Sequence, residues 1–293
     1  MIKRKNRVRL CIAVAWLISF AVWTLAIRFI DVQAIGPKKS SVGFATLNGF
    51  IHNLTGVRLS LYVITDWLGL VPLCIAVGFG LLGLIQWLKR KKLCKVDANL
   101  FVLGGFYIAV FGAYLFFEAF PVNYRPVLID GYLEASYPSS TTLLVLCIMP
   151  TAILQWNERI NNRVLRKSVQ VSSVAFLLFM VLGRLLAGVH WFTDIVGGGL
   201  LSAGLVGLYR FFCRYKNPDL NESLGFRVLY FPYHASFPRK GNGYCFNSNA
   251  RLYAAFTAEP TVSWKSASSN ARKPSSVVPL GEQTAVFSFA GSP

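Results

Sequence analysis

Charged residues are scarce in this sequence, and acidic ones are the scarcest. Only 14% of its 293 residues are Asp, Glu, Lys or Arg, and 12 acidic side chains stand against 30 basic ones. Soluble domains carry about 25% charged residues, so an ordinary soluble enzyme is excluded. A hydrophobic fraction of 54% also excludes disorder along the whole chain. The formal net charge of +18 fits nucleic acid, a membrane surface or an anionic substrate, and the positions of the charges decide among them.

Motifs for metals, disulfides and nucleotides are also missing. The chain has six Cys and three His, with no CxxC pair and no Cys/His spacing of the kind that binds structural zinc. The three glycines at 197–199 follow a helix start and not a strand, so they do not form a nucleotide-binding loop. The sequence therefore predicts neither a metal site nor a cofactor, and the cysteines read as small apolar side chains.

Long apolar runs are what the sequence does contain. A membrane-spanning helix needs roughly 20 mostly apolar residues. Six runs meet this condition, at about 10–30, 67–88, 99–118, 139–156, 169–189 and 194–213. The first is too long for the apolar part of a secretory signal and is read as an uncleaved span. We therefore predict an all-α fold, a six-transmembrane helix bundle over residues 1–216, and a low-order C-terminal tail over 217–293, where Pro, Ser, Asn and Gly are frequent.

The basic residues predict the orientation of this bundle. Most of them stand before the first span, after the second, after the fourth and at the end of the sixth. Because cytoplasmic loops are enriched in Lys and Arg, the N-terminus is predicted to be cytoplasmic and the odd-numbered loops to face outward. The charge is then a topology signal of a multi-pass protein of the cell membrane, and nucleic acid is not needed to explain it. The long outward segment 31–66 contains helix-like apolar spacing over 42–63, which predicts an amphipathic surface helix.

Three polar residues stand out at the outward end of the fifth and sixth spans. Arg184 is followed by His190 and, four residues later, by Asp194. If one helix covers the last two, they share a face and can form a hydrogen bond, which would fix the imidazole tautomer and leave the other nitrogen as a base or nucleophile. Arg184 supplies a permanent cation for an oxyanion or phosphate. The alternative is a set of polar residues that anchor a helix end at the membrane interface.

A second polar cluster precedes the fourth span on the same face. It contains Glu118, Arg125, Glu134 and the stretch Pro138-Ser139, which is typical of a helix N-terminus. The exposed N–H groups of such an end suit a phosphate, although a plain helix cap would explain the stretch equally well. Arg125 lies on the side where the positive-inside bias is absent. Both clusters are therefore expected to converge on one anion.

In this arrangement the sequence resembles the membrane branch of the type-2 phosphatidic-acid phosphatase family. The family's third motif, SRxxxxxHxxxD, is matched in spacing by Arg184, His190 and Asp194, with Gly183 in place of its Ser. The likeness extends over about residues 1–216 and includes the motif order and the six spans. The tail has no counterpart in the family.

The first two motifs are matched in part. Of KxxxxxxRP, the pair Arg125-Pro126 is present, while Glu118 occupies the position of the Lys. Of PSGH, the pair Pro138-Ser139 is present, while Ser140 and Thr141 replace Gly and His. This chain therefore departs from the family at one phosphate-binding cation and at one general acid.

The resemblance implies a role for each matched residue. His190 would attack phosphorus and form a phosphohistidine, with Asp194 as the residue that orients it. Arg125 and Arg184 would bind the phosphate, and Ser139 would donate to it at the helix N-terminus. The expected reaction is hydrolysis of a lipid phosphate or an isoprenoid diphosphate at the outer face of the membrane. The partner is then a membrane lipid; the sequence does not name that lipid or the oligomeric state.

The departures leave two readings open. Thr141 cannot act as a general acid near neutral pH, and loss of such an acid slows a reaction by roughly 10²- to 10⁴-fold without abolishing it. Either Glu118 or Glu134 serves as a substitute acid, or the substrate is a diphosphate whose leaving group needs less protonation. The alternative is a catalytically impaired homologue that binds anionic lipid headgroups without turnover. A transporter is disfavoured, since no broken-helix pair is found.

Overall fold

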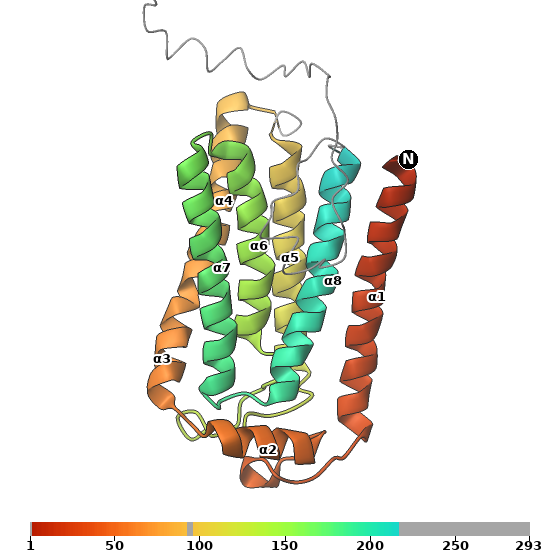
Figure 1. Cartoon of the computed structure of the whole chain (residues 1–293), viewed down its shortest axis with the longest axis vertical. Coiled ribbons are helices and arrows are strands. Elements are labelled where there is room, and N and C mark those ends of the chain that lie inside the picture. The colour runs from red at the N-terminus through yellow and green to blue at the C-terminus, as the bar shows by residue number, and fades with distance from the viewer. Residues whose placement is uncertain (1, 93–95, 217–293) are drawn as a thin grey trace, which may run out of the picture. The chain divides into compact units, whose positions relative to one another are not determined.

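The computed structural model describes residues 2–92 and 96–216, and within these ranges the regular structure is helical, without strands. The helices are α1 (Ile2–Phe29), α2 (Ala45–Thr55), α3 (Leu59–Leu68), α4 (Leu70–Arg90), α5 (Ala98–Ala119), α6 (Ser140–Arg159), α7 (Arg163–Leu186) and α8 (Phe192–Lys216), with one short 3₁₀ turn at Pro37–Lys39. The predicted all-α fold is confirmed (Figure 1). The prediction of a low-order tail at 217–293 falls outside the described residues.

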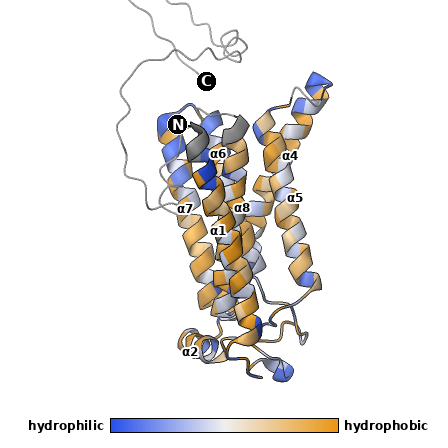
Figure 2. Ribbon diagram, turned by 90° about the vertical axis from the view of Figure 1, so that its right-hand side faces the viewer, coloured by the Kyte–Doolittle hydropathy of each residue, from blue (hydrophilic) through white to orange (hydrophobic). Residues whose placement is uncertain are grey.

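Six helical segments of the described chain are long and apolar enough to cross a membrane. They are Asn6–Phe29, Leu59–Arg90, Ala98–Ala119, Ser140–Arg159, Arg163–Leu186 and Phe192–Cys213. Each contains or overlaps one predicted span, so the protein is a multi-pass membrane protein. Figure 2 shows the apolar residues running along the sides of these helices. A side facing lipid must be apolar because hydrocarbon cannot solvate polar groups.

The region before the second span differs from the prediction. The expected surface helix over 42–63 is divided, since α2 ends at Gly56, whose φ of 64° is a conformation that L side chains rarely adopt. The chain is then tied to the turn after α7 by a hydrogen bond from the Arg58 N–H to the Ala187 carbonyl, at 3.0 Å. From there α3 rises directly into α4, so the span begins earlier than predicted. The remaining helix, α2, lies across the end of the bundle (Figure 1).

Helix α6 forms the centre of the bundle. It packs against α4, α5, α7 and α8. In its most apolar stretch 72% of the residues are buried, against 11% in α1. A helix surrounded by protein can carry more polar residues than one surrounded by lipid, because neighbouring side chains satisfy them. This position explains why α6 can present a polar N-terminus to the interior of the protein.

Helix α1 packs chiefly against α8, and small residues bring the two together. A Cβ atom added at Gly204 would lie 2.5 Å from a side-chain atom of Leu17, and one added at Gly207 would lie 2.8 Å from Ala13. In the sequence, Gly199, Ala203 and Gly207 are spaced four residues apart, which predicts close helix packing at all three. At Gly199 the structure differs, since a Cβ atom built there would have no neighbouring atom within 4 Å.

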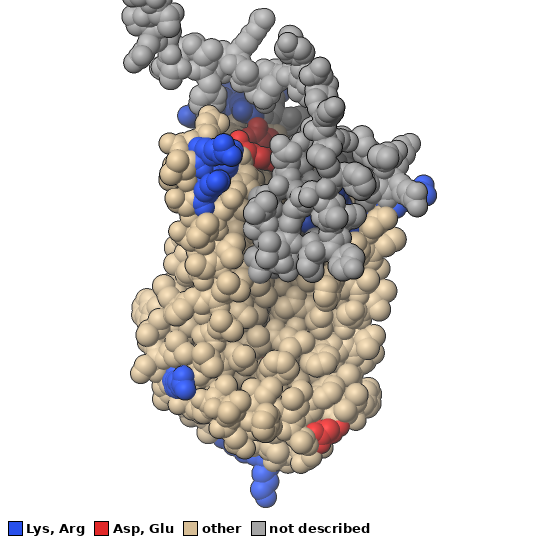
Figure 3. Space-filling model, viewed as in Figure 1, with Lys and Arg blue, Asp and Glu red and all other residues tan. Residues whose placement is uncertain are grey.

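The two ends of the bundle have different chemistry. At one end α4 terminates and α7 begins, and Lys and Arg side chains gather there on the face drawn in Figure 3. At the other end lie α2, the segment 120–139 and the turn between α7 and α8 (Figure 1). We call the second end the site end and the first the basic end. Both predicted polar clusters belong to the site end.

Candidate active site

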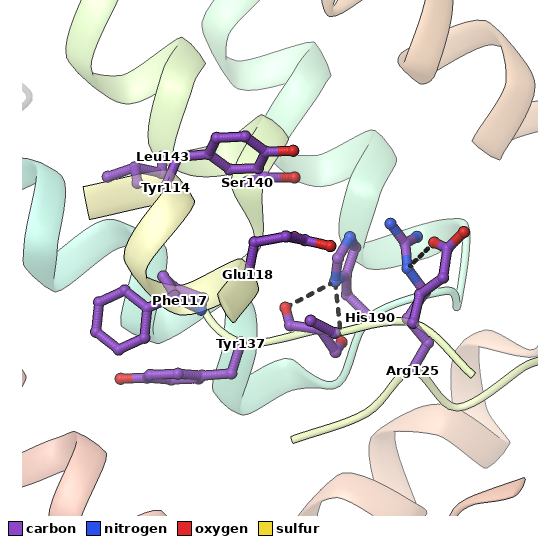
Figure 4. Close-up of a pocket in the computed structure, with 12 residues that line it drawn as sticks. Tyr114, Phe117, Glu118, Arg125, Tyr137, Ser140, Leu143 and His190 are labelled. Atoms are coloured by element: carbon purple, nitrogen blue, oxygen red, sulfur yellow. Dashed lines mark hydrogen bonds and ion pairs between the residues drawn. The ribbon is translucent and has the colours of Figure 1, made fainter. Parts of the chain in front are cut away.

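A cavity of about 290 Å³ opens at the site end, between the last turns of α5, the segment before α6 and the turn before α8. Figure 4 shows its lining. Four of the predicted site residues contribute to it, namely Glu118, Arg125, Glu134 and His190. The remaining lining residues are Tyr114, Phe117, Ala135, Ser136, Tyr137, Pro138, Ser140 and Leu143. Two polar clusters that are far apart in sequence thus meet around one cavity.

His190 lies in the turn between α7 and α8, with 4% of its surface exposed. Its Nδ1 atom lies 3.1 Å from the Ser136 hydroxyl and 3.2 Å from the Ser136 carbonyl oxygen. Its Nε2 atom is buried and has no hydrogen-bond partner. Because a carbonyl oxygen only accepts, Nδ1 carries the proton and donates it. The lone pair is therefore on Nε2, on a side chain that lines the cavity.

Asp194 is fully buried in the first turn of α8 and does not contact His190 directly. Its carboxylate accepts from the Ser136 hydroxyl at 2.5 Å, from the Trp191 N–H at 2.9 Å and from the Asn123 amide at 3.3 Å. The expected direct pair requires one helix to cover both residues. Here α8 begins only at Phe192, so His190 is not on the helix.

Ser136 connects the two groups. A hydroxyl has one hydrogen, and the short contact to Asp194 uses it, so the Ser136 oxygen is free to accept from His190 Nδ1. Asp194, Ser136 and His190 form a chain of hydrogen bonds that ends at the free Nε2. The sequence places Ser136 within the second polar cluster but assigns it no role, because only the fold brings that segment against α8.

The pKa of His190 is lowered well below its ordinary value near 6.5. Burial is the largest cause, and the positive charges of Arg125 and Arg184 add to it. Both effects disfavour the imidazolium. The imidazole is therefore neutral near pH 7, as a nitrogen nucleophile must be.

Two arginines lie beside this histidine, each 9% exposed or less. The Arg184 guanidinium carbon lies 5.1 Å from the centre of the Tyr62 ring, and that of Arg125 lies 5.8 Å from the same ring. Each guanidinium keeps a buried nitrogen without a hydrogen bond, Nη1 of Arg125 and Nε of Arg184. Two cations that share one aromatic ring, both with unused donors, are suited to an anion with several oxygens.

Each arginine also holds a carboxylate. The Nη2 atom of Arg184 donates to Asp66 at 2.8 Å, and Nε of Arg125 lies 3.0 Å from Glu134. These partners neutralise and orient the guanidinium groups. Asp66 and Tyr62 come from α3, which the sequence assigned to a surface helix and the start of a span. The sequence could have linked these two residues to the site only if α3 had been recognised as the start of the second span.

The structure shows where the residues of the two partly matched motifs lie. Thr141 accepts a hydrogen bond from Arg184, the residue to which the resemblance assigns phosphate binding, and it offers no acid there. Ser139 is fully buried, and its hydroxyl accepts from Thr142 at 3.0 Å. Its neighbours Pro138 and Ser140 line the cavity at this turn. Glu118 lines the cavity, and Figure 4 shows its carboxyl end turned toward His190.

The unpaired guanidinium nitrogens of Arg125 and Arg184 are donors of the kind that suits an anion. Over the described ranges, no three His, Cys, Asp or Glu side chains gather as metal ligands. Comparison with known families shows that residues 106–218 match the sequence model of the PAP2 superfamily. Over this range the chain is similar to the PAP2 superfamily. The match begins within α5 and contains all three matched motifs of the predicted phosphatase site.

One solved structure with a similar chain is a transmembrane PAP2 type phosphatidylglycerolphosphate phosphatase from Bacillus subtilis. It shares 18% sequence identity, with a TM-score of 0.44, and the alignment covers 69% of this chain and 96% of that one. No curated protein matches this chain. The match of residues 106–218 to the PAP2 superfamily supports a membrane phosphatase function in general terms.

Proposed function

We propose that the protein is a membrane phosphatase that hydrolyses a lipid phosphate or an isoprenoid diphosphate at the outer face, through a phosphohistidine at His190. The observation that carries this proposal is that His190, Arg125 and Arg184 each have at least one buried nitrogen without a hydrogen-bond partner. Unpaired buried donors are costly, on the order of 1–3 kcal/mol each. A phosphate would satisfy the two arginine donors and receive the lone pair of the histidine.

In the first half of the reaction, the Nε2 lone pair of His190 forms a bond to phosphorus. The ester bond breaks, and its electron pair leaves with the alcohol or phosphate oxygen. Positive charge then develops on the imidazole ring, where Nδ1–H donates to Ser136. Asp194 stabilises that charge through the Ser136 hydroxyl, which keeps the ring in the reactive tautomer. Water later cleaves the phosphorus–nitrogen bond and restores the neutral His190.

Arg125 and Arg184 stabilise the negative charge on the phosphoryl oxygens. Such preorganised donors act most strongly where water is excluded, as at these buried positions. Glu134 and Asp66 hold the two guanidinium groups in place before substrate arrives. Ser139, which the resemblance assigns as a donor, would act here through its backbone turn and its neighbour Ser140.

Protonation of the leaving group is the step for which the family residue is missing. Of the two candidate substitute acids, Glu134 already forms an ion pair with Arg125. Glu118 forms no hydrogen bond or ion pair with the described residues and lines the cavity, so of the two it is the one that is open to a substrate. A diphosphate substrate would lower the demand on this step, because a phosphate is a weaker base than an alkoxide.

The charge distribution supports the proposed outer-face location. The Lys and Arg residues that flank the spans gather at the basic end, and the positive-inside rule assigns that end to the cytoplasm. The site end then faces outward, where a lipid of the outer leaflet can reach it. Attaching a thiol probe to a cysteine introduced at Tyr132, an exposed residue of the site end, tests this orientation in intact cells.

The test of function is phosphate release by the purified full-length protein, compared with His190→Ala. We expect release from a lipid phosphate by the wild type only, with a labelled phosphoryl group trapped on His190 in a reaction quenched with alkaline detergent. Equal release by the two proteins would sink the enzyme proposal. The trapped adduct should be alkali-stable and acid-labile, which separates phosphohistidine from phosphoserine.

A silent, headgroup-binding homologue is the second candidate, and Glu118 and Thr141 are the observations that favour it. Restoring the family residues with Glu118→Lys and Thr141→His separates the two. If the scaffold is an enzyme, the double variant should release phosphate faster than the wild type. If it is a binding protein, lipid phosphate should bind to the wild type without any release.

A further inference from the structure

The two arginines proposed to bind the phosphate are each paired with a carboxylate. Arg125 and Arg184 already hold Glu134 and Asp66, so each guanidinium is neutralised before substrate arrives. Asp194 is buried behind His190. A phosphate dianion would therefore enter a site in which carboxylates outnumber cations, and repulsion at such short range weakens binding.

Glu118 adds a further carboxylate on one wall of the cavity. It stands where the resemblance expects a lysine, it lines the same cavity as His190, and it lacks an ion-pair partner among the described residues. Tyr114 lies one turn earlier on α5 and also lines the cavity. Figure 4 shows these two side chains on the α5 wall, with the Glu118 carboxyl directed toward the histidine. A carboxylate with an adjacent aromatic ring is a recognition pattern for an ammonium group.

The second, independent observation is the pair of unused nitrogens that fix where the phosphate sits. His190 Nε2 and Arg125 Nη1 are buried, have no partners and belong to side chains that line this cavity. A cavity of about 290 Å³ is large enough for a phosphate and one further small group. The cavity thus has a phosphate wall, formed by His190 and Arg125, and a carboxylate wall, formed by Glu118 and Tyr114.

We propose that the substrate is a zwitterionic phosphate monoester lipid, with an amine close to the ester oxygen, whose ammonium group is bound by Glu118. This inference rests on the proposed phosphatase function and specifies its substrate class. It accounts for both departures from the family pattern. The substrate ammonium replaces the missing cation, and it also supplies the acid that Thr141 cannot, since Thr141 is hydrogen-bonded to Arg184.

The proton transfer balances without another reactant. The His190 lone pair forms the bond to phosphorus, the phosphorus–oxygen ester bond breaks, and the leaving oxygen takes a proton from the neighbouring ammonium. The lipid departs as a neutral amino alcohol. Water then attacks phosphorus, the electron pair of the phosphorus–nitrogen bond returns to Nε2, and phosphate leaves with both hydrogens of that water. An acid held beside the leaving oxygen within the same molecule has a high effective concentration.

The experiment compares two lipids that differ in one group, 2-aminohexadecyl phosphate and 2-hydroxyhexadecyl phosphate, with the full-length protein in detergent micelles. We expect the wild type to favour the amine in kcat/KM by about tenfold, equivalent to roughly 1.4 kcal/mol. Glu118→Gln should remove this preference, and Glu118→Lys should reverse it. Asp130→Asn is the matched control, because Asp130 is an exposed carboxylate of the site end that does not line the cavity. It should keep the wild-type preference.

A change on the substrate side gives the same answer without altering the protein. N-acetylation of the amine removes its charge and its acidic proton, so the wild type should lose the preference for that lipid. Equal rates on the amine and hydroxyl lipids would overturn the substrate class while leaving the phosphatase function intact. Loss of activity on both lipids in Glu118→Gln would overturn it as well, and would identify Glu118 as the general acid. Release from neither lipid by the wild type would overturn the proposed function itself.

Discussion

Both ends of the bundle contain polar networks, but among the described residues only the network at the site end leaves buried side-chain atoms without hydrogen-bond partners. At the basic end, Gln86 donates to Asp97 at 2.9 Å, Asn99 donates to Glu158 at 2.9 Å, and Gln155 donates to the Tyr209 hydroxyl at 2.8 Å. No buried side-chain nitrogen or oxygen of that end is left without a partner in the described chain. Such a network ties helix ends together and leaves nothing for a ligand.

At the site end the network is incomplete. His190, Arg125 and Arg184 each keep one buried nitrogen without a partner, although carboxylates and hydroxyls surround them. An isolated protein has no reason to leave such groups unpaired, because each costs stability. Under the proposed function, the network at the basic end serves stability alone, and the network at the site end is completed by a phosphate. Substitutions at the two ends should therefore have different consequences.

Arg184→Gln should have the largest effect on activity. It removes a buried cation from the phosphate and leaves Asp66 and Thr141 without their donor. Removal of one donor to transition-state charge reduces turnover by roughly 10²- to 10³-fold. The measurement is phosphate release by purified protein whose size-exclusion profile matches the wild type. A folded variant with wild-type turnover would remove Arg184 from the phosphate clamp.

Ser136→Ala should have the next largest effect, on kcat rather than KM. Hydrogen bonds to charged groups contribute about 1.5–3 kcal/mol, so loss of this one should slow turnover by roughly 10- to 100-fold. Ser136→Thr keeps the hydroxyl and should restore much of the rate. A purely structural Ser136 would instead change the melting temperature without this split between kcat and KM.

Arg125→Gln should move the pH dependence as well as weaken binding. The positive charge of Arg125 helps to lower the pKa of His190, so its removal should make protonation easier. In the wild type, kcat/KM should stay level as the pH falls through 6.5 and decline only at lower pH, where His190 becomes protonated. In the variant this decline should begin at higher pH. A pH–rate profile with an unshifted acid limb would contradict the proposed charge coupling.

Arg159→Gln, at the basic end, should have the smallest effect on activity. Its guanidinium donates to the Gln155 carbonyl at 3.0 Å and lies 3.9 Å from Asp97, far along α6 from the cavity. Its loss should lower the free energy of unfolding by about 1 kcal/mol. Thermal melting should detect that change, while phosphate release stays at the wild-type level. A large loss of turnover in this variant would show that the two ends are coupled.

The sequence predicted which residues lie at the site better than it predicted the contacts between them. Arg125, Glu118, Glu134 and His190 were expected near one anion, and all four line one cavity. These expectations rested on spacing within two short segments and on the topology that puts both on one side. Their chemical roles remain predictions.

Contacts between residues of distant segments were not predicted from the sequence. The serine between Asp194 and His190 comes from a different cluster, and its part depends on where α8 begins. The carboxylate that holds Arg184 comes from α3, more than one hundred positions away in sequence. Local patterns report local geometry, whereas these pairs are made by the packing of distant helices.

By itself, the sequence predicted the six candidate membrane spans that the described residues contain, and it predicted which residues could act on a phosphate. Those properties follow from transfer of apolar side chains into hydrocarbon and from the ionisation of particular side chains, and both are properties of residues in order along the chain. Only the tertiary structure decided that Ser136 stands between the aspartate and the histidine, that two arginines share the ring of Tyr62, and that Glu118 lines the same cavity. These contacts depend on helix packing. It brings together residues that are far apart along the chain, and their positions in the sequence do not predict the contact.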